Sequence, residues 1–110
     1  MPELVPFERR CEPRIPVGLP VVEIDQETTY FQYATDLSAG GLFLRGTAPH
    51  QIGSQVTILL MLPGDKAPTR VPAEVVGNRD GLGRGTHIKF VAPSESEALE
   101  RVRAFVRARG

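Results

Sequence analysis

The feature that most constrains this sequence is the even scatter of residues that interrupt helices. Eleven glycines and ten prolines are spread over 110 residues, at intervals that suit short strands separated by turns. Between them, apolar and polar residues alternate, as half-buried β-strands require. This pattern predicts a single domain made mainly of short strands.

We expect six antiparallel strands. They begin near Arg14 and continue at residues 28–35, 41–45, 55–62, 70–77 and 86–91. Pro16 and Pro20 cannot donate to a ladder, so the first strand, with Ile15, Val17, Leu19 and Val21 on one face, is expected at an edge or irregular. Residues 36–40 are expected to form a turn in which glycine supplies a positive φ. Closing the strands into a barrel would remove unpaired edges, so the predicted fold is a six-stranded antiparallel β-barrel.

The last segment changes from strand to helix periodicity. Its apolar residues fall at helical spacing, namely Ala98, Leu99, Val102, Phe105 and Val106. Ser94 and Glu97 match a capping box, and acidic residues precede the closing arginines, as the helix dipole favours. We therefore expect a flexible arm at 1–14, a barrel at 15–92 and an amphipathic C-terminal helix at 93–110 that covers an open end or face of the barrel.

Composition argues against several classes of protein. The formal net charge is zero, which disfavours binding to nucleic acid or membranes through bulk charge. Cys11 is the single cysteine, so no internal disulfide can form. The N-terminus lacks a signal-peptide pattern, and the longest apolar run, residues 58–62, is too short to span a bilayer. These features predict a cytoplasmic protein without membrane insertion.

Enzyme chemistry is not expected. His50 and His87 lie far apart in the sequence and match no metal-ligand spacing, and no catalytic motif of the Cys-x-x-Cys or Gly-x-Ser-x-Gly kind occurs. Cys11 has arginine neighbours but no adjacent base. We expect no cofactor, no metal and no catalytic residue.

The first cluster of candidate binding residues is arginine-rich. Arg9, Arg10 and Arg14 lie within six residues, and the last two are four residues apart. Arginine forks bind phosphate oxygens and guanine edges bidentately. The alternative is a solvated charged arm, in which Glu8 and Glu12 accompany the arginines.

The second cluster is Asp36, Ser38, Gly40 and Gly41. An aspartate carboxylate can accept hydrogen bonds from guanine N1–H and N2–H₂, and the serine and turn amides can add polar contacts. The alternative is a tight turn between strands, which explains the same residues without a ligand.

Taken in order, the two clusters resemble the PilZ family signature. Arg10-x-x-x-Arg14 is followed by Asp36-x-Ser38-x-x-Gly41, and residues 40–44, 52–56 and 85–90 are also similar to the family. The resemblance implies a bacterial six-stranded barrel that binds cyclic di-GMP, a second messenger. Arg10 and Arg14 would grip phosphates and guanine faces, Asp36 and Ser38 would contact a guanine edge, and Gly41 would shape the turn. Arg9 occupies the place of an extra arginine that accompanies two intercalated ligand molecules.

The expected function is therefore that of a receptor or adaptor. Its arm would change conformation around cyclic di-GMP and signal to an unknown downstream protein. The alternative is a ligand-independent PilZ-like adaptor whose arginines contact an acidic protein surface. Binding of single-stranded nucleic acid is a weaker third hypothesis, because Tyr30, Phe31 and Tyr33 cluster without nearby Arg or Lys.

Overall fold

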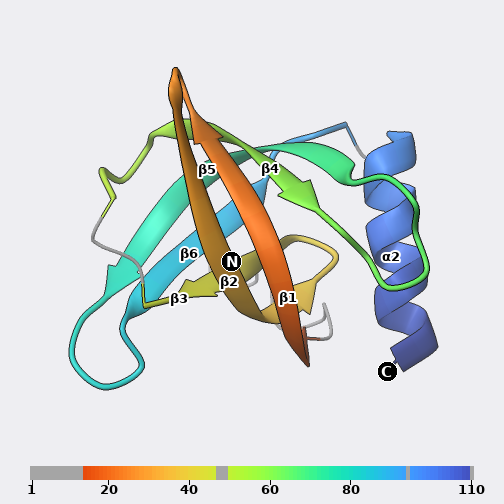
Figure 1. Cartoon of the computed structure of the whole chain (residues 1–110), viewed down its shortest axis with the longest axis horizontal. Coiled ribbons are helices and arrows are strands. Elements are labelled where there is room, and N and C mark those ends of the chain that lie inside the picture. The colour runs from red at the N-terminus through yellow and green to blue at the C-terminus, as the bar shows by residue number, and fades with distance from the viewer. Residues whose placement is uncertain (1–13, 47–49, 94, 110) are drawn as a thin grey trace, which may run out of the picture.

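The six strands form a closed barrel with one helix beside it (Figure 1). The structure is a computed structural model that describes residues 14–46, 50–93 and 95–109. Its elements are β1 (Arg14–Asp25), β2 (Thr28–Ser38), β3 (Gly41–Arg45), β4 (Gln55–Leu60), β5 (Thr69–Arg79), β6 (Gly85–Phe90) and α2 (Glu97–Arg109). The strand order is β1-β2-β3-β6-β5-β4, and every neighbouring pair is antiparallel. The predicted fold class is confirmed.

Strand alternation fills the barrel with aliphatic side chains. Val56, Ile58 and Leu60 of β4 point inward, and the inward residues of β5 are Val71, Ala73 and Val75. Full burial of one such branched side chain contributes about 1.5–3 kcal/mol to folding. The residues that alternate with them, which include Gln55, Arg70 and Glu74, face outward.

The first strand is irregular where its prolines lie. Residues before Val21 pair with β2 alone, and only Val21–Ile24 also pair with β4. The register shifts between Pro16 and Leu19, as expected for a strand that proline interrupts. Ile15, Leu19 and Val21 are buried, whereas Val17 within the irregular stretch is only partly covered.

The turn predicted at residues 36–40 is wrong, because β2 continues to Ser38 and only Ala39 and Gly40 turn. Asp36 pairs with Pro16 of β1 and Phe43 of β3, so partners on both sides hold turn-favouring residues in a strand. A register shift after Ala34 accompanies this extension.

Two other strands end at different residues from those predicted. β4 ends at Leu60, two residues before the predicted end, and β5 continues to Arg79, two residues beyond it.

Helix α2 covers the barrel core with its apolar face, as predicted. Leu99, Val102 and Val106 are buried in the same cluster as the barrel interior. The observed cap is Ser96, whose Oγ accepts a hydrogen bond of 3.1 Å from the Leu99 N–H. The predicted cap, Ser94, lies outside the described residues. In the described part of the chain, no helix has the length and apolar character to cross a bilayer.

Candidate functional site

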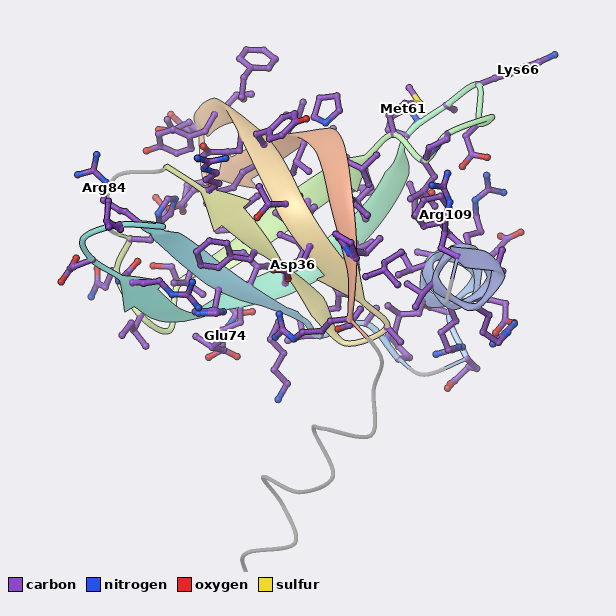
Figure 2. All side chains as sticks on the ribbon, turned by 90° about the horizontal axis from the view of Figure 1, so that it is seen from below. Asp36, Met61, Lys66, Glu74, Arg84 and Arg109 are labelled. Atoms are coloured by element: carbon purple, nitrogen blue, oxygen red, sulfur yellow. The ribbon has the colours of Figure 1, made fainter. Side chains whose placement is uncertain are left out.

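The two sequence clusters meet at Arg14 and Asp36. The Nη1 atom of Arg14 lies 2.8 Å from Oδ1 of Asp36, and their side chains are 58% and 34% exposed. Arg14 opens β1 opposite Ser38, the last residue of β2, so antiparallel pairing brings Arg14 and the second cluster to the same end of the barrel. Asp36 lies on the barrel wall, away from the β5–β6 loop that carries Arg84 (Figure 2). Arg14 and Asp36 therefore form a cation–carboxylate pair on an accessible part of this wall.

Ser38 is engaged inside the turn. Its Oγ accepts a hydrogen bond of 3.1 Å from the Gly40 N–H and lies 3.4 Å from the Gly41 carbonyl, to which it can donate. The Gly40 carbonyl in turn accepts from the Phe90 N–H at 2.8 Å. Ser38 is only 5% exposed, so in this structure its hydroxyl organises the turn beside Asp36.

Gly41 is required for a reason other than a left-handed turn. A Cβ built on Gly41 would lie 2.1 Å from the Ile88 carbonyl oxygen, and its φ is not in the positive region. Gly40 does not have a positive φ either, so the expectation that glycine supplies one in this turn is wrong. Glycine lets β3 approach β6 closely, which keeps the turn after Ser38 in place.

Two other predicted site residues lie in the part of the chain that the structure does not describe. Arg9 and Arg10 lie outside the described residues, as does Cys11. Of the predicted arginines, the structure therefore positions Arg14 alone.

Sequence reasoning missed an aromatic residue next to Asp36. Phe43 pairs in register with Asp36 on one side and with His87 on the other. It points outward, between the inward Leu42 and Leu44, yet it is only 5% exposed. The Phe43 and His87 rings lie 4.8 Å apart between centroids, tilted by 57°. A run of three apolar residues in an alternating strand was the available signal that its outer face is also covered.

Two arginines and one aspartate act on the imidazole of His87 on this wall. Partial burial lowers the pKa of His87 most, and the guanidinium groups of Arg79 and Arg14 lower it further. The Asp36 carboxylate opposes the shift. The lowered pKa favours the neutral imidazole, so the charges around His87 are those of Arg79, Arg14 and Asp36.

The other histidine belongs to a buried polar cluster at the opposite end of the β1–β2 hairpin. Glu23 is 0% exposed, and His50 Nε2 lies 3.0 Å from each of its carboxylate oxygens. Gln32 donates to the same carboxylate at 3.0 Å, and Asn78 bonds both the N–H and the carbonyl of His50. The cluster anchors His50 to β1 and β5. Across the described ranges, no group of three or more His, Cys, Asp or Glu could hold a metal ion.

The family model described as PilZ domain matches residues 8–108. No curated protein matches the chain.

Several solved structures share the fold. The PilZ domain of YcgR from Escherichia coli, determined with cyclic di-GMP, has a TM-score of 0.71 at 17% identity, covering 91% of this chain and 90% of that one. The PilZ domain of CeSA from a cellulose-synthesizing bacterium has a TM-score of 0.65 at 25% identity, covering 86% and 98%. MotI/DgrA, an inhibitor of motility from Bacillus subtilis, has a TM-score of 0.72 at 18% identity. The match covers 92% of this chain but only 50% of the Bacillus protein.

Proposed function

Since the chain belongs to the PilZ domain family, we propose that it is a non-enzymatic receptor for cyclic di-GMP. The observation that carries the proposal is the exposed Arg14–Asp36 pair at the point where both signature motifs meet. The YcgR domain, which has the same fold, was determined with this ligand.

The pair suits the chemistry of the ligand. The Arg14 guanidinium can bind phosphate oxygens or the O6 and N7 atoms of guanine, and the Asp36 carboxylate can accept from guanine N1–H and N2–H₂. A solvent-exposed ion pair contributes only about 0–1 kcal/mol, whereas a hydrogen bond to a charged group contributes about 1.5–3 kcal/mol. The ion pair is therefore weak enough for ligand contacts to replace it.

Arg9 and Arg10 complete the proposed site from the preceding segment. The family match begins at residue 8 and so includes both. Ordering backbone around a ligand costs roughly 1–2 kcal/mol per residue, so several charge-assisted bonds are needed to offset it. In this proposal Arg9 supports a second, intercalated ligand molecule, and a measured stoichiometry of one would remove that role.

In this proposal the receptor signals by contacting a downstream protein. Ligand binding rearranges the arginine-bearing arm and biases which surface a downstream protein meets. A surface for such contacts exists on β2, where Phe31 is 84% exposed and Tyr30 and Tyr33 are also exposed. The same surface favours the alternative of a ligand-independent adaptor, whose arginines would contact an acidic protein.

An NMR titration of the whole chain with cyclic di-GMP tests the proposal. We expect the amide signals of Arg14, Asp36 and Gly40 to shift, whereas those of Glu23 and Gln32, at the far end of the hairpin, stay in place. Unchanged spectra at millimolar ligand would refute the receptor and favour the adaptor.

A further inference from the structure

A second arginine lies on the same wall as the Arg14–Asp36 pair. The guanidinium carbon of Arg79, near the end of β5, lies 4.9 Å from the centroid of the Phe43 ring. The same ring contacts His87 on β6. Phe43 is therefore covered by an arginine and an imidazole, which together form an aromatic and cationic surface.

This surface is continuous with the proposed ligand site. Asp36, Phe43, His87 and Gly77 are successive register partners on β2, β3, β6 and β5. Arg79 lies two residues beyond Gly77 on β5, and its guanidinium lies over the ring of Phe43, the register neighbour of Asp36.

The Arg79 side chain is pre-positioned for an acceptor. In the described part of the chain it forms no ion pair, and its guanidinium lies over the Phe43 ring. Contact with the Phe43 ring restrains its guanidinium, so less side-chain freedom is lost when the fork binds a ligand. Its influence on the pKa of His87 places its charge close to the row.

We propose that Arg79, supported by Phe43 and flanked by His87, reads a guanine base of the ligand beside the Phe43 ring. The inference rests on the proposed function, because it assigns this arginine to one half of a two-base ligand. The planar fork would donate two hydrogen bonds to guanine O6 and N7. Arg79 is thus a specificity-determining residue outside both sequence clusters.

Calorimetric titration of four proteins with cyclic di-GMP tests this assignment. They are the unchanged chain, Arg79→Ala, Arg79→Lys and the control Arg70→Ala, which removes an exposed arginine from the same strand. We expect Arg79→Ala and Arg79→Lys each to raise Kd by about tenfold or more, because lysine keeps the charge but loses the fork. Arg70→Ala should stay within about twofold of the unchanged chain, as expected for a side chain without ligand contact.

The outcomes separate the two proposals. If the unchanged chain does not bind, the receptor function itself is refuted. If it binds and Arg79→Ala behaves like Arg70→Ala, only the role of Arg79 is refuted. If Arg79→Lys keeps full affinity, charge alone acts there and base reading is refuted. Melting temperatures of all four proteins show whether each variant is folded before its affinity is compared.

Discussion

Arg14 and Asp36, 22 residues apart in the chain, lie 2.8 Å apart between Nη1 and Oδ1. The contact arises because Asp36 stays in β2 and pairs with Pro16, two residues beyond Arg14 on β1. The cation and carboxylate proposed to hold a ligand therefore neutralise one another in this structure. A ligand must replace this pair, and both side chains are exposed enough to allow it.

Replacing the carboxylate should affect binding more than stability. We expect Asp36→Ala to weaken cyclic di-GMP binding strongly, because the acceptor for guanine N–H groups is lost. Its free energy of unfolding should fall by less than about 1 kcal/mol, because the ion pair is exposed. Calorimetry and urea denaturation measure the two effects, and a large loss of stability with unchanged affinity would contradict this role.

Gly41 should be sensitive to a single methyl group. Gly41→Ala places a Cβ against the Ile88 carbonyl, so β3 and β6 must separate, at a cost of about 1–3 kcal/mol. The matched control is Gly77→Ala, whose Cβ would meet its nearest atom, on His87, at an ordinary 3.7 Å. Urea denaturation should show a change below about 0.5 kcal/mol for this control. Equal losses in the two variants would argue against the close approach.

The Glu23–His50 cluster should stabilise the fold without affecting the ligand. His50→Ala leaves a buried carboxyl group with one hydrogen-bond partner fewer, which costs about 1–3 kcal/mol. Adding Glu23→Leu should restore part of the stability, because the stranded carboxylate is then gone. Unfolding measurements on both variants test this, and a double variant no more stable than His50→Ala would contradict it. Where these variants fold, affinity for cyclic di-GMP should stay unchanged.

His87 should make stability depend on pH. Its folded-state pKa lies below the ordinary value of 6.5, so below that value the unfolded chain binds more protons than the folded chain. The free energy of unfolding therefore falls as the pH is lowered, because protonation of His87 favours the unfolded chain. We expect His87→Gln to lose less stability than the unchanged chain between about pH 7.5 and about pH 5.5. Parallel stability curves for the two proteins would show that His87 does not titrate differently on folding.

The barrel could be predicted because its signals are local. Alternation defined the inward faces of β4 and β5, the prolines indicated the irregular start of β1, and the helical spacing of Leu99, Val102 and Val106 identified the face that covers the core. The end of β2 was missed because aspartate and serine favour turns in isolation, and only pairing on both sides keeps them in a strand.

The wall around the candidate site was harder to predict, since it depends on register between distant strands. The burial of Phe43 and the position of Arg79 follow from how β3, β6 and β5 align. The contact of His50 with Glu23 likewise joins residues 27 positions apart. The motif residues were found through their order and spacing, and the identity of the proposed ligand came from family resemblance.

The most direct test of the receptor proposal is calorimetric titration of the unchanged chain and Arg14→Ala with cyclic di-GMP. We expect the unchanged chain to bind at low-micromolar concentration or more tightly, and Arg14→Ala to lose binding while remaining folded. No heat of binding from the unchanged chain at millimolar ligand would contradict the proposal.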